Sequence, residues 1–198
     1  MAASSKAEIL DDLRSTRLEA VELPNLDQDW ITFEDRVQQF SDVLQAVGGR
    51  AVRVRNLEDV NRELDQLPAY AEAAKVCSLV DGIRKANVQI QDAADPHELE
   101  DVDFFVAPGQ FGVAENAAVW VTDQGVRHRV LHFLTQHLAL VLPVAELVDN
   151  MHQAYQRLSF TEPGFGLFLS GPSKTADIEQ SLVIGAHGAR SLTVFLVA

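Results

Sequence analysis

Two almost uninterrupted apolar runs lie in the second half of the chain, at residues 138–142 (LALVL) and 193–197 (TVFLV). A strand with one face in solvent alternates apolar and polar residues, whereas a strand buried on both faces reads as a continuous apolar run. These runs therefore predict strands inside a sheet that is covered on both sides. Such coverage is typical of the parallel sheets of α/β proteins, in which helices connect the strands.

The remaining segments fit this class. Residues 30–47 place apolar side chains three and four positions apart, which predicts a helix with one apolar face, and Gly48 and Gly49 follow as its stop signal. Asn56 is expected to cap another helix, whose first turn holds Glu58 and Asp59. Further helices are expected at 6–20, 144–158 and 175–184, and strands at 51–54, 75–80, 104–107, 117–122, 138–142, 166–170 and 192–197.

These elements predict one structural domain of the α/β class, a three-layer α/β/α sandwich with a mainly parallel sheet. Residues 1–50 are expected to form an N-terminal helical segment that packs on the main domain, 51–198. A chain of 198 residues that is 47% hydrophobic can bury a core of this size.

The charge of the chain argues against several classes of partner. With 16 basic and 29 acidic residues the formal net charge is −13, and such a surface repels phosphate backbones and anionic headgroups. Nucleic acid and membranes are therefore not expected partners, and a small anion needs a local site. The start of the chain, MAASSK, leads into acidic residues and no apolar run, so we expect a cytoplasmic protein without a signal peptide.

The single cysteine, Cys77, cannot form an internal disulfide and cannot by itself ligate an iron–sulfur cluster. Its neighbours read as a buried strand, so we expect a small buried side chain and not a reactive thiol. The chain is expected to bind no cofactor of its own.

The segment 170–179 (SGPSKTADIE) lies between an expected strand and an expected helix. Gly171 lets the backbone approach a ligand, Ser173 or Thr175 can cap the helix, and Lys174 adds a positive charge. Free amides at a helix N-terminus favour an anion, and loops at the carboxyl ends of strands are where open α/β sheets bind ligands. A plain turn before a capped helix and a ligand-binding loop both remain open, and the pattern is not a Walker A loop.

Together with residues 181–188 (SLVIGAHG), this segment resembles the C-terminal signature of the LutC/YkgG family, also called the LUD domain. Residues 111–116 (FGVAEN) resemble the family's segment ending in Ala-Glu-Thr-Gly, and 137–141 (HLALV) resemble its histidine-containing strand. The resemblance covers about residues 99–198 well. It implies a fold similar to that of the sugar-phosphate isomerase and CoA-transferase group (NagB/RpiA/CoA-transferase-like). It also implies a non-redox accessory role in L-lactate oxidation, beside partner subunits that carry iron–sulfur and cysteine-rich modules.

The chain departs from the family at one loop, where Ala-Glu-Thr-Gly-Thr is replaced by AENAA at 114–118. The glycine and both threonine hydroxyls are missing, so a ligand bound there is expected to differ. Glu115 also has a faint resemblance to the nucleophilic glutamate of CoA-transferases, which forms an acyl intermediate. Three roles stay open for it: a nucleophile, a ligand-binding or structural hydrogen-bonding group, and a solvated carboxylate.

Three histidines lie close together in the sequence, His128, His132 and His137. His128 and His132 share a helical face but lack the glutamate of a zinc-peptidase motif, so no metal is expected. His187 is expected on the loop after the helix that Lys174 opens. The predicted pocket binds a small anion and is formed by Glu115, Asn116, His137, Gly171, Ser173, Lys174, Thr175 and His187. The alternatives are an acyl- or CoA-transferring enzyme that uses Glu115 and a scaffold protein with a vestigial pocket.

Overall fold

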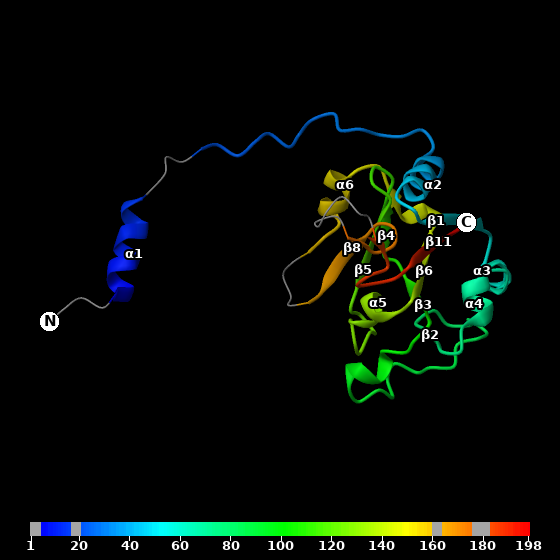
Figure 1. Cartoon of the computed structure of the whole chain (residues 1–198). Coiled ribbons are helices and arrows are strands. Elements are labelled where there is room, and N and C mark those ends of the chain that lie inside the picture. Colours follow the sequence, from blue (N-terminus) through cyan, green and yellow to red (C-terminus); the bar gives the residue numbers. More distant parts are fainter. Residues whose placement is uncertain (1–4, 17–20, 160–163, 176–182) are drawn as a thin grey trace.

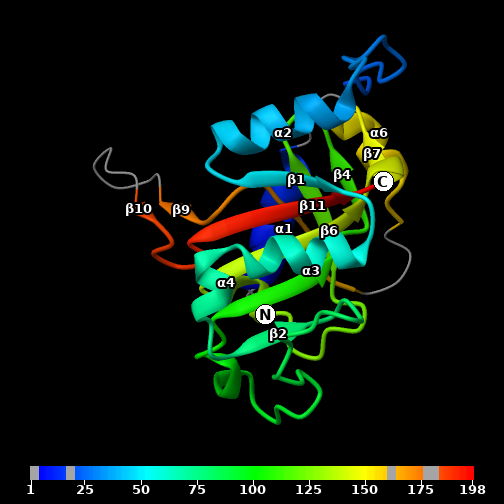
Figure 2. The same ribbon diagram turned by 90° about the vertical axis from the view of Figure 1, so that its right-hand side faces the viewer.

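The computed structural model describes residues 5–16, 21–159, 164–175 and 183–198. At its centre lies a five-stranded sheet in the order β1-β11-β6-β3-β2, and every neighbouring pair in it is parallel. Figure 2 shows these strands side by side, with α3 and α4 in front of them. The predicted α/β class with a mainly parallel sheet is confirmed. The strands are β1 (Arg50–Val54), β2 (Val76–Ser78), β3 (Phe104–Pro108), β6 (His137–Pro143) and β11 (Ser191–Val197).

The two apolar runs divide their side chains between two cores, one on each face of this sheet. In β6, Leu138, Leu140 and Leu142 point into one core, whereas Ala139 points into the other. Alternate side chains of a strand lie on opposite faces, so a strand with cores on both sides needs apolar residues at every position. The prediction that these runs are doubly buried strands is therefore confirmed.

One face of the parallel sheet is covered by α3 (Leu57–Asp65) and α4 (Pro68–Glu72). Asn56 caps α3 as predicted, because its side chain accepts a hydrogen bond from the backbone N–H of Asp59 at 3.0 Å. The apolar side chains of α3 face the sheet, and Val60 and Leu64 have no exposed surface.

The other face is covered by α2 (Arg36–Ala46), α5 (Leu131–Leu134) and a second sheet, in the order β7-β4-β5-β8. Figure 1 shows this second sheet and α3 on opposite sides of the parallel sheet. The sequence predicted strands at 117–122 and 166–170, but it did not predict that they form a separate sheet, because β7 and β8 join this sheet from distant segments of the chain. The strands of this sheet are β4 (Phe111–Val113), β5 (Ala118–Thr122), β7 (Leu147–Val148) and β8 (Gly166–Leu169).

The predicted helix over 144–158 is wrong in its first half. Residues Val144–Glu146 form the short 3-10 helix η2, and β7 then pairs in parallel with β4. The helix α6 (Met151–Gln156) begins after Asn150, whose side chain accepts from the backbone N–H of Gln153 at 3.0 Å. Pairing with a distant strand and this cap outweigh the local helical periodicity.

The predicted helix over 175–184 is wrong at both ends. β9 (Lys174–Thr175) and β10 (Val183–Ile184) form an antiparallel pair, in which Thr175 lies opposite Val183 and Lys174 opposite Ile184. Threonine, valine and isoleucine are β-branched and favour strands. The middle of the predicted helix, 176–182, lies outside the described residues. Lys174 and Thr175 therefore belong to a strand.

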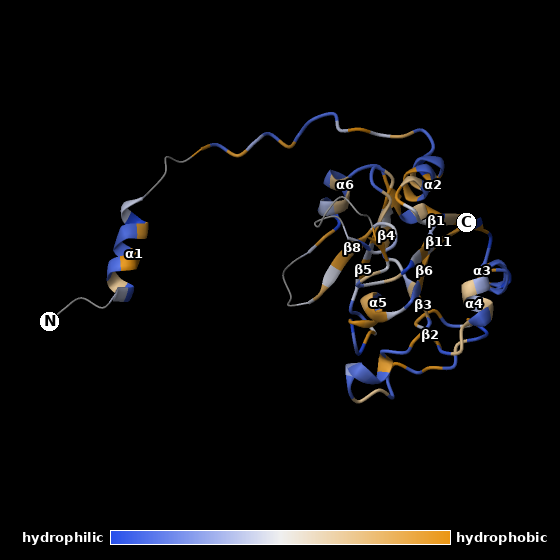
Figure 3. Cartoon of the chain, viewed as in Figure 1, coloured by the Kyte–Doolittle hydropathy of each residue, from blue (hydrophilic) through white to orange (hydrophobic). Residues whose placement is uncertain are grey.

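The N-terminal part of the chain contacts the domain unevenly. In α2, Phe40 and Leu44 are fully buried, whereas α1 (Ser5–Ser15) has no buried residue and lies apart from the domain in Figure 1. Hydrophobic bands are visible on α1 in Figure 3. The division of the chain at residue 50 stays a prediction. Another short 3-10 helix, η1 (Pro96–Leu99), lies in the loop before β3.

Candidate functional site

The motif loop after β8 is held against the segment that precedes β11. The backbone N–H of Ser173 donates to the carbonyl of Ala189, and the N–H of Gly185 donates to the carbonyl of Ser173, both at 2.9 Å. A Cβ on Gly188 would lie 3.0 Å from the Cβ of Ser173, so a side chain at position 188 would crowd this contact. The two halves of the C-terminal motif are thus packed on each other.

Between these segments lies a cavity of about 330 Å³. Its apolar side is formed by Leu138, Leu192 and Phe168, which come from β6, β11 and β8. Its polar side includes Ser173 and Lys174 of the motif loop. The other lining residues are His132, Phe133, Leu169, Ser170, Gly171, Pro172, His187, Gly188 and Ala189.

The charge of this lining is opposite to that of the chain. The described lining includes one lysine, Lys174, and two histidines, His132 and His187, but no aspartate or glutamate. Burial lowers the pKa of His132, which is only 3% exposed, so this ring is neutral near about pH 7. Lys174 and His187 are exposed at the cavity. In a chain with a net charge of −13, this is a local site suited to an anion.

The cavity lies at the amino ends of β6 and β11, next to Leu138 and Leu192. The sequence predicted the motif loop at the carboxyl ends of parallel strands, and that placement is wrong. The loop does follow the carboxyl end of a strand, but this strand is β8, which runs antiparallel to β5 in the second sheet. Lys174 belongs to β9, and the segment 176–182, which was expected to supply free helix amides, lies outside the described residues.

Four of the predicted site residues line the cavity: Gly171, Ser173, Lys174 and His187. Gly171 has φ +76, and a Cβ there would lie 2.9 Å from the Cγ2 of Val47. This position requires glycine for its backbone and for its close contact with the end of α2.

Glu115 is turned toward α6 and does not line the cavity. Its Oε2 accepts a hydrogen bond from the backbone N–H of Met151 at 2.9 Å, in the first turn of that helix. Its own N–H donates to the carbonyl of Asp149 at 2.9 Å. Of the three roles left open for Glu115, these contacts fit a structural hydrogen-bonding group.

Asn116 joins the Glu115 loop to the cavity. Its carbonyl accepts a hydrogen bond at 2.7 Å from the hydroxyl of Ser170, which is a lining residue. The next residue, Ala117, has φ 53, the one positive value among the described non-glycine residues. Position 117 is where the family segment has its glycine, so the backbone shape has been kept although the glycine has not.

His137 and Thr175 are also outside the cavity lining. The Nδ1 of His137 lies 2.8 Å from the hydroxyl of Ser191 on the neighbouring strand β11, and burial is the main reason why its pKa is lowered. The hydroxyl of Thr175 is 3.3 Å from the backbone N of Val183, across the β9–β10 pair. Both side chains take part in strand contacts.

Sequence reasoning missed Ser170 and His132 as lining residues. Ser170 belongs to the C-terminal motif, which is a signal for its place in the lining. For His132 the sequence offers no such signal, because nothing local links it to a loop almost forty residues later. Within the described ranges, no group of three or more histidine, cysteine, aspartate or glutamate side chains could hold a metal ion.

Comparison with known proteins identifies the family. The model of the LUD domain matches residues 37–197, which is most of the chain and begins within α2. The chain belongs to the LUD domain family. Among curated relatives, the LUD chain is similar to "Lactate utilization protein C" of an Exiguobacterium species, with 32% identity over 103 residues. It is 28% identical to the protein of that name from Geobacillus thermodenitrificans over 104 residues.

These alignments cover 49% and 50% of the LUD chain, but 44% and 43% of the relatives. The chain thus matches less than half the length of these curated proteins. A crystal structure of a DUF162 family protein from Deinococcus radiodurans has a similar fold, with a TM-score of 0.64 and 17% identity. That similarity covers 82% of the LUD chain and 96% of the solved one. Among the described residues, no helix has the length and apolar character needed to cross a membrane.

Proposed function

We propose that this LUD chain is a non-redox accessory subunit of an L-lactate-oxidising iron–sulfur system, and that the cavity beside Lys174 binds a small anion. The observation that carries the anion proposal is the composition of the lining, which among the described residues holds a lysine and two histidines but no carboxylate, in a strongly acidic chain. The names of the curated relatives support the link to lactate.

The shape of the cavity favours a small carboxylate. Its volume of about 330 Å³ lies at the low end of the range for ligand pockets, and its floor of Leu138, Leu192 and Phe168 is apolar. A short carbon chain can lie on this floor while its carboxylate faces Lys174. L-Lactate and pyruvate have this form, and inorganic phosphate is the matching probe without a carbon chain.

The partners proposed for the chain are iron–sulfur and cysteine-rich subunits in the cytoplasm. The single Cys77 has no exposed surface and is not available as a cluster ligand, so redox centres of such a system would be carried by other chains. Co-expression with the iron–sulfur and cysteine-rich products of neighbouring genes tests this part. Co-purification, with L-lactate oxidation that requires this chain, is expected, and full activity without it would refute the accessory role.

A thermal-shift series tests the anion site. L-Lactate, pyruvate and phosphate are compared with lactamide, the neutral amide of lactate. A ligand at tenfold excess over its Kd is expected to raise Tm by about 3–5 °C. We expect a shift with at least one of the anions and none with lactamide. Equal shifts with lactate and lactamide, or no shift with any of the three anions, would overturn the anion proposal.

A further inference from the structure

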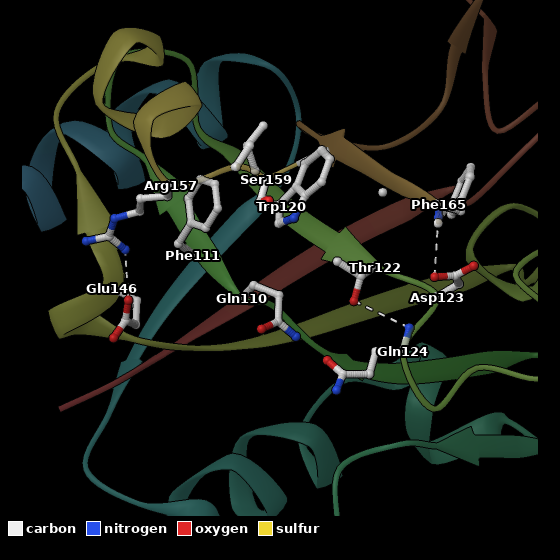
Figure 4. Close-up of a pocket in the computed structure, with 13 residues that line it drawn as sticks. Gln110, Phe111, Trp120, Thr122, Asp123, Gln124, Glu146, Arg157, Ser159 and Phe165 are labelled. Carbon is white, nitrogen blue, oxygen red and sulfur yellow. Dashed lines mark hydrogen bonds and ion pairs between the residues drawn. The ribbon is translucent and has the colours of Figure 1, made fainter. Parts of the chain in front are cut away.

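A larger cavity, of about 750 Å³, lies over the outer side of the second sheet, and its described lining contains no residue of the C-terminal motif (170–179 and 181–188). Figure 4 shows its lining, which comes from β4, β5 and β8 and from the segments around η2 and the end of α6. The side chains of Trp120 and Thr122 on β5 face it, whereas those of Val119 and Val121, which alternate with them, are buried in the core. This site is independent of the function proposed above.

The indole of Trp120 forms the aromatic wall of this cavity, and it packs closely against Gly166. A Cβ on Gly166 would lie 2.2 Å from Cζ2 of Trp120, so the indole lies directly against the backbone of β8. Phe168 and Phe111 pack beside the indole at centroid distances of 4.7 and 6.4 Å, and they also contact each other at 6.0 Å. The indole is thus held against β8, and it lines the cavity in a fixed position.

Two amide side chains in the lining lack an internal partner. Within the described ranges, no hydrogen bond is formed by the side chains of Gln110 and Gln124, which both line the cavity and are exposed. Each primary amide can both donate and accept. Together they can recognise a ligand edge that alternates donors and acceptors.

The charges around the cavity disfavour an anion. Arg157 is paired with Glu146 at 2.8 Å and lies over the ring of Phe111 at 5.5 Å. Asp123, whose carboxylate accepts from the backbone N–H of Phe165 at 3.4 Å, has no cationic partner among the described residues. The described lining therefore has a net negative charge, the reverse of the cavity beside Lys174.

The cavity also lies where an open α/β sheet binds ligands. An adjoining hollow of about 600 Å³ is bounded by Pro108 and Pro143, the last residues of β3 and β6. Gln110 and Glu146 line both spaces. The hollow at the carboxyl ends of β3 and β6 thus adjoins the cavity that Trp120 lines. This edge of an open parallel sheet is the usual location of its ligands.

We propose that this cavity binds a neutral planar heterocycle with an amide-like edge, such as a purine or pyrimidine base. The heterocycle stacks on Trp120, and Gln110 and Gln124 bind its edge. Stacking on an aromatic side chain tolerates any planar ring, whereas a glutamine amide selects for paired donors and acceptors. A saccharide could also lie on Trp120, and the experiment separates the two.

Fluorescence quenching in the full-length Trp30→Phe variant tests the proposal, because Trp30 and Trp120 are the two tryptophans and this change leaves Trp120 as the only one. The probes are adenosine, uridine, AMP and cellobiose. We expect saturable quenching by adenosine or uridine, with weaker binding of AMP than of adenosine. Gln110→Ala and Gln124→Ala are each expected to weaken nucleoside binding by about five-fold or more.

Gly166→Ala should weaken nucleoside binding more than either glutamine variant does, because the added methyl group displaces the indole of Trp120. Gln45→Ala is the control, since that glutamine is exposed on α2 and does not line the cavity. Binding by Gln45→Ala should equal that of the parent. Absence of nucleoside quenching, tighter binding of AMP, quenching by cellobiose alone, or full binding in both Gln110→Ala and Gln124→Ala would each overturn the proposal.

Discussion

The guanidinium of Arg36 donates two hydrogen bonds to the carboxylate of Asp149, at 2.9 Å from Nε and 2.7 Å from Nη2. Asp149 is 1% exposed and also accepts from the backbone N–H of Phe33 at 3.0 Å. The pair fastens the start of α2 to the turn before α6. Because the carbonyl of Asp149 accepts from the N–H of Glu115, the same residue supports the Glu115 loop.

Arg36→Ala is predicted to lower the free energy of unfolding by about 1–3 kcal/mol, because it leaves a desolvated carboxylate without its charged partner. Arg14→Ala is the matched control. Arg14 pairs with Asp11 at 3.1 Å, but both side chains are about three-quarters exposed, and such a pair contributes less than about 1 kcal/mol. Urea unfolding measures both variants, and equal effects would contradict the structural role of Arg36.

The Arg36–Asp149 pair also predicts how the free energy of unfolding depends on pH. The hydrogen bonds from Arg36 are the main reason why the pKa of Asp149 lies below its usual value. A carboxyl group whose pKa is lower in the folded than in the unfolded chain stabilises the fold at pH values above its unfolded pKa, which is about 3.9 for aspartate. This stabilisation is lost as the pH falls through the folded pKa. The difference in stability between wild type and Asp149→Asn should therefore shrink as urea unfolding is repeated from about pH 6 to about pH 3. A difference that stays constant over this range would show that the carboxylate charge does not matter.

Ala117 and Ala118 offer a comparison of the same substitution at two buried positions. Ala117 has φ 53, whereas Ala118 begins β5 with an ordinary backbone. An alanine in the left-handed region is strained by about 1–2 kcal/mol, and glycine removes this strain. Ala117→Gly should therefore be about 1 kcal/mol more stable than Ala118→Gly, although each loses one buried methyl group. Equal unfolding free energies for the two variants would contradict the strained loop.

Cys77 is predicted to be unreactive in the folded protein. It has no exposed surface, and burial raises the pKa of its thiol to about 11. The thiolate is the reactive form, so a thiol reagent should label the native protein very slowly and the urea-unfolded protein fully. Rapid labelling of the native chain would contradict the buried placement of Cys77 in β2.

Local sequence patterns predicted the parts of the fold that depend on burial alone. The runs at 138–142 and 193–197 had to be doubly buried strands, and Asn56 had to cap a helix, because each signal lies within a few residues. The sequence could not show that 147–148 pair with β4, or that Thr175 pairs with Val183. Those pairings are made with other segments and override helical periodicity.

The site was partly predictable, because four of its residues lie in one local sequence motif. The motif placed Gly171, Ser173, Lys174 and His187 together, and the structure joins them around one cavity. The sequence placed the motif loop at the carboxyl ends of the parallel strands, and this was wrong, because β8 belongs to a separate mixed sheet. Glu115 was grouped with the site by resemblance, but its carboxylate contacts α6.

The measurement that tests the central claim most directly is calorimetric titration of L-lactate into three forms of the full-length chain. These are the wild type, Lys174→Ala and Lys6→Ala, the last removing the same charge from α1. The account predicts that Lys174→Ala weakens binding by about five-fold or more, while Lys6→Ala leaves it unchanged. Equal affinities in wild type and Lys174→Ala would contradict an anion site at this cavity.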